Sequence, residues 1–456
     1  MIDTDLKFCE SELNEVINMF AKAEGLEIRH IFSEKDDRVV NTVVVNGKSY
    51  AFGNLLLDVK SDLERKRYVK RYAKLSLYKA LSEVLGEKLP WGALTGIRPT
   101  KLAYQQLQER GEFKDFFVNT MKVSPDKTEL VEKVLESQKG IYEKNDDNTD
   151  FFVFIPFCPS RCKYCSFISA DIKGAEKYVD YYVDVLVKEI RESARYIKKL
   201  RSIYIGGGTP VALDDDALKR ILSEVAKINS GVEFTVEAGR ADKITADNLK
   251  LFRDCGVTRV CVNPQTFNDR TLELLGRKHT AAQVEEKYLA AKDYFVTNMD
   301  LIAGLNGEDF DDFSYSLDKA VSLSPDNITV HTLCIKRGSL LAEDVKRLEA
   351  GKVSQMVDYA GITLGKNGYN PYYLYRQKYM AGNLENVGYS RPGKECVYNV
   401  DVMEEISSTV ACGANAISKR VKDGGEKIER AASPKDVKTY LDKISSIMAA
   451  KDKLFS

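Results

Sequence analysis

Between residues 150 and 335, hydrophobic positions alternate between two patterns. Six short runs are rich in β-branched and aromatic residues: FFVFIPF, SIYIGG, VEFTVEA, TRVCVNP, TNMDLIAG and NITVHTL. Segments with helical spacing lie between them, including YVDYYVDVLVKEIRESARYIKKL, DDDALKRILSEVAKI and FDDFSYSLDKAVSL. This repetition predicts parallel strands joined by right-handed helical crossovers. We therefore predict an α/β fold with a partial (β/α)6 barrel of the TIM type over residues 150–370.

Residues 1–145 have a different pattern, which predicts a mixed α+β domain. RVVNTVVVNGKSYAF reads as a hairpin, because Asn46-Gly47 is a favoured two-residue turn between β-rich runs. The basic segment DLERKRYVKRYAKLSLYKALSEVLG predicts a helix that ends at Gly86. Its basic residues form either a nucleic-acid stripe or a solvated helix face. The charged stretch EKNDDNTD at 143–150 then predicts a linker.

The repeat stops near residue 370, and the last segment, 371–456, predicts a small C-terminal substrate or lid domain. It begins with the tyrosine-rich stretch YNPYYLYRQKYMAGN, and a helix is expected from Pro434 onward.

Composition narrows the class of protein. The 456 residues carry 68 Lys and Arg against 68 Asp and Glu, so no overall charge attracts nucleic acid or membrane. The amino-terminal stretch is acidic, and no apolar run approaches the roughly 18 residues of a membrane span, so we expect a cytoplasmic protein. Nine cysteines with irregular spacing indicate reduced thiols, and most of them are expected to be small buried hydrophobic residues.

Three cysteines are different, because Cys158, Cys162 and Cys165 lie within FIPFCPSRCKYCSFIS, directly after the first predicted barrel strand. Clustered thiolates select zinc, copper(I) or an iron–sulfur cluster. A structural zinc site needs a fourth ligand, whereas the three histidines, His30, His279 and His331, are remote in sequence. A [4Fe–4S] cluster on three thiolates leaves one iron open. The triplet therefore predicts a metal centre with an exogenous ligand.

C-x3-C-x2-C with Tyr164 before the last cysteine resembles the signature of the radical S-adenosylmethionine (radical SAM) superfamily. The resemblance implies that S-adenosylmethionine chelates the open iron of a [4Fe–4S] cluster and yields a 5′-deoxyadenosyl radical. IGGGTP, after the second strand, resembles the segment that binds the methionine amino group. Gly207, Gly208 and Thr209 are its matching positions.

Further motifs resemble the oxygen-independent coproporphyrinogen III oxidase family in order and spacing, namely VEAGR, RVCVNPQTFND, LLGRKHT and NMDLIAGL. WGALTGIRPTK resembles the longer HemZ-type coproporphyrinogen dehydrogenase branch, and the whole resemblance covers residues 85–420. By position, four residues match family contacts to S-adenosylmethionine: Glu237, Gln265, Arg277 and Asp300.

The resemblance implies a function in haem biosynthesis, the oxidative decarboxylation of two coproporphyrinogen III propionates to vinyl groups. Its partners would be the tetrapyrrole and a reductant such as flavodoxin or ferredoxin. A substrate with four carboxylates needs basic residues, and the candidates are Arg98, Lys101, Arg376, Lys378, Arg391 and Lys394.

The chain departs from the family pattern beside the cysteines. Phe167 stands where members usually have a further cysteine, and Phe152 and Phe154 stand where many have Tyr and His. The H-N-x-x-Y-W motif of a haem chaperone branch is also absent, since Tyr398-Asn399 occurs in that region. Two alternatives thus stay open, a haem-binding carrier that uses a residue such as His331, and a radical enzyme acting on haem, another macrocycle or RNA.

Overall fold

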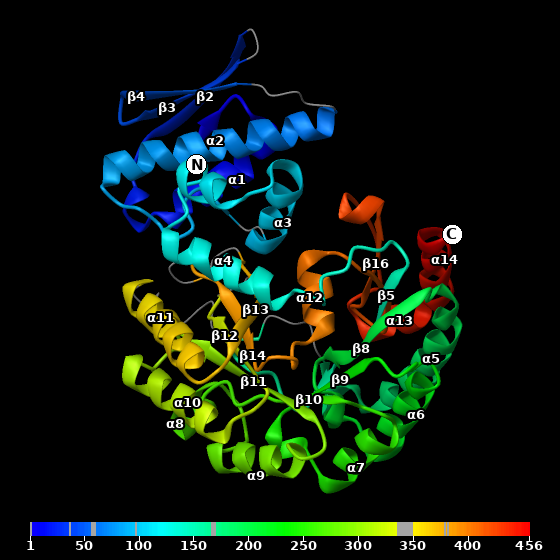
Figure 1. Cartoon of the computed structure of the whole chain (residues 1–456). Helices are drawn as coiled ribbons and strands as arrows, with labels where there is room; N and C mark the ends of the chain where they lie inside the picture. The colour runs from blue at the N-terminus through cyan, green and yellow to red at the C-terminus, as the bar shows by residue number, and fades with distance from the viewer. Residues whose placement is uncertain are drawn as a thin grey trace. The chain divides into compact units, whose positions relative to one another are not determined.

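The structure is a computed structural model that describes residues 2–35, 38–55, 61–95, 98–165, 170–334, 350–377, 380 and 383–456. The chain divides into two compact units (Figure 1). Unit 1 comprises Met1–Glu132 with Arg376–Leu384, and unit 2 comprises Lys133–Tyr375 with Glu385–Ser456. The predicted domain limits at 145 and 370 stay a prediction.

Unit 1 contains a four-stranded sheet in the order β1-β2-β3-β4. Its strands are β1 (Asp3–Thr4), β2 (Ile28–Lys35), β3 (Arg38–Val45) and β4 (Lys48–Leu55). Its helices are α1 (Glu10–Met19), α2 (Asp62–Leu85), α3 (Pro99–Arg110) and a π-helical turn Phe116–Thr120, and α4 (Pro125–Ser137) runs across the division. The predicted hairpin is confirmed, because β3 pairs antiparallel with β4 and Asn46 and Gly47 have φ of 48° and 82°.

Helix α2 is the predicted basic helix, and it ends as expected at Gly86 in the left-handed conformation. Several of its basic side chains are used inside unit 1. Lys70 pairs with Glu12 at 2.6 Å, and Lys74 donates to Thr95 Oγ1 at 3.0 Å. Burial lowers the pKa of Lys74 to about 8. These contacts favour a packed helix over a nucleic-acid stripe.

Unit 2 is built on one sheet of eleven strands, in the order β13-β14-β12-β11-β10-β9-β8-β5-β15-β16-β17. The middle six are β5 (Asn148–Ile155), β8 (Lys199–Gly207), β9 (Glu233–Gly239), β10 (Arg259–Val262), β11 (Val296–Ala303) and β12 (Asn327–Thr332). They contain the six predicted runs and pair in parallel in chain order. The α/β class and the partial barrel are therefore confirmed.

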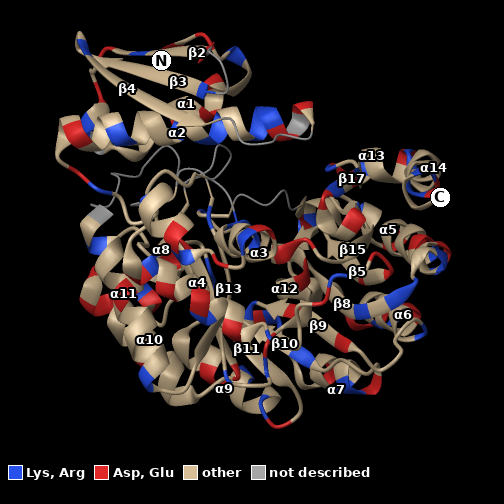
Figure 2. Cartoon of the chain, turned by 45° about the horizontal axis from the view of Figure 1, so that its top comes forward, with Lys and Arg blue, Asp and Glu red and all other residues tan. Residues whose placement is uncertain are grey.

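Helices follow these strands along the outer side of the curved sheet (Figure 1). They are α5 (Ile172–Ser193), α6 (Asp215–Ala226), α7 (Ala246–Asp254), α8 (Asp269–Leu274), α9 (Ala281–Ala291), α10 (Phe310–Leu323) and α11 (Ala350–Lys366). Helix α5 differs from the predicted segment 178–200, because the Asp171 carboxylate accepts from Lys173 N and starts the helix earlier. Positive and negative residues are mixed over these helices, without segregation by sign (Figure 2).

The segment 371–456 supplies both edges of the same sheet. Strands β13 (Asn370–Tyr375) and β14 (Asn386–Ser390) extend it beyond β12, and β15 (Ser408–Cys412), β16 (Ile417–Lys422) and β17 (Lys427–Ala432) extend it beyond β5. Backbone groups at a sheet edge need partners, which these strands provide. The helix expected from Pro434 is present as α13 (Val437–Asp442) and α14 (Ile444–Phe455). A substrate or lid role for this segment stays a prediction.

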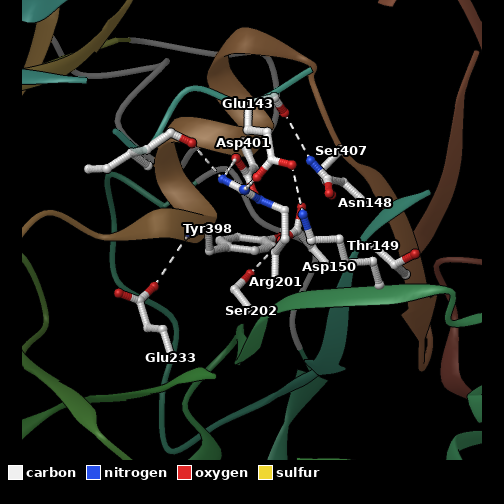
Figure 3. A network of polar contacts seen from close by, with 12 residues as sticks. Glu143, Asn148, Thr149, Asp150, Arg201, Ser202, Glu233, Tyr398, Asp401 and Ser407 are labelled. Atoms are coloured by element: carbon white, nitrogen blue, oxygen red, sulfur yellow. Dashed lines mark hydrogen bonds and ion pairs between the residues drawn. The ribbon is translucent and has the colours of Figure 1, made fainter. Parts of the chain in front are cut away.

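A buried polar network ties helix α12 (Val397–Glu404) to the amino ends of β5 and β8 (Figure 3). Arg201 donates to both carboxylate oxygens of Asp401, at 2.6 and 2.9 Å. Ser202 Oγ donates to the fully buried Asp150 at 2.6 Å. The network thus lies at the amino ends of these strands, whereas the cysteine triplet follows the carboxyl end of β5.

Among the described residues, no helix is both long enough and apolar enough to cross a membrane.

Candidate functional site at the carboxyl end of the barrel

The cysteine triplet lies where the carboxyl end of β5 leads into the short strand β6 (Phe157–Cys158), which pairs with β7 (Ala170–Asp171). Cys158, Cys162 and Cys165 are half-buried. Thr209 Oγ1 donates to Cys158 Sγ at 3.6 Å, and Cys165 N donates to Cys162 O at 3.1 Å. The neighbouring Phe167 lies outside the described residues.

These residues are chemically suited to an iron–sulfur cluster, since three thiols share one loop and one of them accepts a hydroxyl hydrogen bond. However, nowhere in the described parts of the chain are three His, Cys, Asp or Glu side chains gathered as metal ligands. Ligation of a cluster by the three cysteines therefore stays a prediction.

The glycine turn after β8 packs tightly against the strand that leads into the cysteine loop. Gly207 has φ of 105°, and a Cβ atom there would lie 2.8 Å from the Phe154 ring. A Cβ atom at Gly208 would lie 2.4 Å from Phe157 O. The amides of Gly208 and Thr209 donate to Ile155 O and Phe157 O, both at 2.7 Å. These glycines are thus needed for backbone packing, and their contact with S-adenosylmethionine stays a prediction.

Glu237 lies near the carboxyl end of β9, beside this turn. Tyr204 donates its hydroxyl hydrogen to Glu237 Oε1, and Gly207 N donates to Oε2 at 3.3 Å. Burial raises the pKa of Glu237 to about 7, although the bond from Tyr204 opposes the shift. Glu237 can therefore exist in both protonation states near neutral pH.

Asp300, on β11, has a neighbouring histidine. Its Oδ1 accepts from Asn298 at 2.8 Å, and its Oδ2 lies 3.8 Å from His331 Nε2. Burial alone would raise the pKa of Asp300, but His331 and further hydrogen bonds lower it below its usual value. His331 Nδ1 lies 3.3 Å from the Tyr375 hydroxyl. Both ring nitrogens of His331 thus face protein groups, which does not favour an axial haem ligand.

Gln265 and Arg277 are connected to these elements. The Gln265 backbone amide donates to Asp300 O at 2.8 Å, and its carbonyl accepts from Ile302 N at 2.9 Å. Arg277 is buried and donates to the Tyr164 hydroxyl at 2.7 Å and to Asn263 O at 2.9 Å. The structure therefore brings the predicted site residues to one end of the barrel, whereas their contacts with S-adenosylmethionine stay predictions.

Comparison with known proteins places this site in a family. The model of the radical SAM superfamily matches residues 152–320. The oxygen-independent coproporphyrinogen-III oxidase-like protein HemZ of Bacillus subtilis is 38% identical over 371 residues, which cover 77% of this chain and 74% of that protein. The chain belongs to the HemZ family of radical SAM proteins. Membership implies a [4Fe–4S] cluster and S-adenosylmethionine as cofactors.

A second related sequence and a solved structure are also similar to this HemZ family member. The heme chaperone HemW of Lactococcus lactis is 32% identical over 235 residues, which cover 49% of this chain and 60% of that protein. The solved structure of coproporphyrinogen III oxidase HemN from Escherichia coli matches with a TM-score of 0.55 and 20% identity, over 67% of this chain and 71% of that chain. The HemN match shows a shared fold.

Sequence reasoning missed an aromatic stack that lines the inside of the HemZ-type barrel. The rings of Tyr204 and Tyr398 stack with centroids 4.3 Å apart, and Phe152 stacks on Tyr398 at 5.8 Å. The alternation of side chains along the strands could have indicated part of this stack. Phe152 on β5 pairs with Tyr204 on β8, so both side chains lie on the same face of the sheet. No pattern in the sequence near Tyr398, on α12, indicates that its ring joins this stack.

The basic candidates for substrate carboxylates have varied surroundings. Arg376, in unit 1, donates to the carbonyls of Leu94 and Asn383 at 2.5 and 2.8 Å, so its guanidinium has a structural role. Arg391 and Lys394 lie at the amino end of β12, where Arg391 N donates to Asp326 O. That end is opposite the cysteine loop, which argues against their binding substrate there. Arg98 and Lys101 lie at the start of α3 in unit 1, and Lys378 is outside the described residues.

Proposed function

We propose that this chain is an oxidoreductase that decarboxylates propionate groups of coproporphyrinogen III to vinyl groups without oxygen, in haem biosynthesis. The observation that carries the proposal is the extent of the HemZ similarity. It spans 371 residues, whereas the superfamily model matches only 152–320. The similarity therefore includes segments outside the shared radical SAM core, where substrate specificity is expected.

The cofactors would supply a radical that removes hydrogen from the substrate, and the protein would position the reactants. Cys158, Cys162 and Cys165 would hold the cluster. Gly207, Gly208 and Thr209 would contact S-adenosylmethionine through the turn after β8.

Charged side chains would bind the rest of S-adenosylmethionine. The carboxylates of Glu237, on β9, and Asp300, on β11, suit hydroxyl or amino groups of that ligand, because both are acceptors on the parallel strands that flank β10. Gln265 is tied to Asp300, and Arg277 offers a guanidinium for a carboxylate.

The aromatic stack of Phe152, Tyr204 and Tyr398 supports a water-poor interior for radical chemistry. Phe154 extends this surface, with its ring centroid 6.2 Å from that of Phe152 in an edge-to-face contact. When each substrate radical loses carbon dioxide and forms its vinyl group, one electron passes to a separate one-electron acceptor. A flavodoxin or ferredoxin is the proposed reductant for the cluster.

The test is anaerobic reconstitution with iron, sulfide, reductant and S-adenosylmethionine, followed by addition of coproporphyrinogen III. The proposal predicts 5′-deoxyadenosine together with vinyl products. Formation of 5′-deoxyadenosine with unchanged coproporphyrinogen would overturn the substrate assignment and leave the radical chemistry intact.

A haem-binding carrier is the second candidate, because proteins named heme chaperone HemW match 41–67% of this chain. It predicts stoichiometric haem binding without turnover. Spectroscopic titration of the anaerobic protein with haem decides this point, and absence of binding would remove the candidate.

A further inference from the structure

Two buried arginines contact the cysteine loop, one at a residue before Cys162 in the sequence and one at a residue after it. Arg240, after β9, donates from Nη1 to Ser160 Oγ at 2.6 Å. Arg277 donates from Nη1 to the Tyr164 hydroxyl at 2.7 Å. Ser160 lies between the first two cysteines and Tyr164 between the last two. Each spacer of the triplet is therefore fixed by one guanidinium.

Asp242 connects the two arginines. Its carboxylate accepts from Arg240 Nε and Nη2 at 3.0 and 3.1 Å, a bidentate pair. Asp242 Oδ1 also lies 3.7 Å from His279 Nδ1, while His279 Nε2 accepts from Arg277 Nε at 3.4 Å. Because Nε2 accepts, the proton of the neutral ring is on Nδ1 and faces Asp242. One chain of contacts thus runs from Ser160 to Tyr164.

The chain of contacts is shielded from water. The side chains of Arg240, His279 and Asp242 are 3%, 0% and 16% exposed. Tyr164 also packs against the apolar cluster of Leu275, Ile302, Leu305 and Leu333. Because little water reaches these groups, their charged hydrogen bonds are only weakly screened. Removal of one partner would leave a buried polar group unsatisfied and would destabilise the loop.

We propose that Asp242 is a positioning residue for the cysteine loop, acting through Arg240 on Ser160 and through His279 and Arg277 on Tyr164. The proposal rests on the cluster chemistry of the proposed function and is independent of the tetrapyrrole. The loop is held before the cluster arrives, so cluster assembly does not have to order it. Asp242 also balances the positive charges of Arg240 and Arg277 near the cluster, and outer hydrogen bonds and net charge set a cluster's reduction potential.

The first test uses the full-length apoprotein and limited trypsin digestion. Arg161 and Lys163 lie exposed within the loop and are trypsin targets. Asp242→Asn should speed cleavage after these residues about tenfold, the factor expected from losing a charged hydrogen bond. Asp254→Asn, which breaks only the exposed pair of Asp254 with Lys250, is the matched control and should leave the rate unchanged.

The second test measures the midpoint potential of the reconstituted cluster by anaerobic redox titration. Asp242→Asn should shift the potential upward, because two positive charges lose their counter-ion, and Asp242→Glu should restore most of the wild-type value. Cleavage within twofold of the wild type together with an unchanged potential would overturn the proposal.

Two milder variants keep the proposal falsifiable if Asp242→Asn fails to fold. Ser160→Ala and Tyr164→Phe each remove one hydroxyl and leave the buried Asp242–Arg240 pair intact. Each should speed cleavage several-fold, and the double variant should exceed either one. Wild-type cleavage in all three would overturn the proposal, whatever the outcome with coproporphyrinogen.

Discussion

The hydroxyl of Tyr204 donates to the carboxylate of Glu237 across the inner face of the barrel, next to the glycine turn. Burial raises the pKa of Glu237 to about 7 even though this bond acts in the opposite direction. Tyr204→Phe should therefore raise the pKa of Glu237 further, so that less carboxylate is present at pH 7. If Glu237 binds S-adenosylmethionine as a carboxylate, binding strengthens as pH rises through about 7 in the wild type and through a higher pH in the variant.

Calorimetric titration of the reconstituted protein between about pH 6 and 9 measures this shift. Near pH 7 the variant should bind S-adenosylmethionine roughly tenfold more weakly, as expected for one lost charged hydrogen bond, and recover at alkaline pH. Binding without pH dependence, or a shift toward lower pH, would contradict the assignment of Glu237.

Replacement of Cys165 by Ala should abolish the brown [4Fe–4S] absorbance and all 5′-deoxyadenosine formation, because two thiolates cannot replace a three-cysteine ligand set. Iron content and the visible spectrum after reconstitution check this. Cys255→Ala is the control, because Cys255 is half-buried at the end of α7, away from the triplet. A wild-type spectrum in Cys165→Ala would exclude Cys165 as a ligand.

Asp150 contributes a pH dependence to stability. Burial and the neighbouring Asp401 raise the pKa of Asp150 well above its usual value. Its stabilising contribution is therefore complete below the unfolded pKa of about 4 and is lost as pH rises toward the folded pKa. Asp150→Asn should therefore make the free energy of unfolding fall less steeply as pH rises. Urea unfolding from about pH 5 to 8 checks it, and curves with the same pH slope in both proteins would refute the expectation.

Gly388, on β14, lies beneath the ring of Tyr373 from β13. A Cβ atom at Gly388 would lie 1.8 Å from that ring, so Gly388→Ala must displace Tyr373 and its contact with Thr329. We expect a loss of about 1–3 kcal/mol in the free energy of unfolding, typical of overpacking. Gly365→Ala in α11, where a Cβ atom meets nothing within 4 Å, is the control. Equal stability of both variants would contradict the tight packing at this edge.

The sequence predicted the barrel well because each strand and helix between residues 150 and 335 has a strong local period. It also predicted the cysteine loop, since strand direction alone puts Cys158 at the carboxyl end of β5. The sheet edges had no such signal. β15 is short and pairs with β5, more than 250 residues earlier in the chain.

The polar contacts of the site could not be predicted from short stretches of the sequence. Arg240 reaches Ser160 and Asp242 approaches His279 only because the loops of neighbouring strands meet in the folded barrel. Arg391 and Lys394 looked suitable as carboxylate ligands by charge. However, β14 runs antiparallel to β12 and carries them to the opposite end of the barrel.

The central claim concerns the substrate, and mass spectrometry of the products from coproporphyrinogen III under strict anaerobiosis tests it most directly. Each conversion of a propionate to a vinyl group should remove one carbon dioxide and two hydrogen atoms, with 5′-deoxyadenosine appearing in step. Coproporphyrinogen of unchanged mass, in a reconstituted protein that cleaves S-adenosylmethionine, would contradict the account.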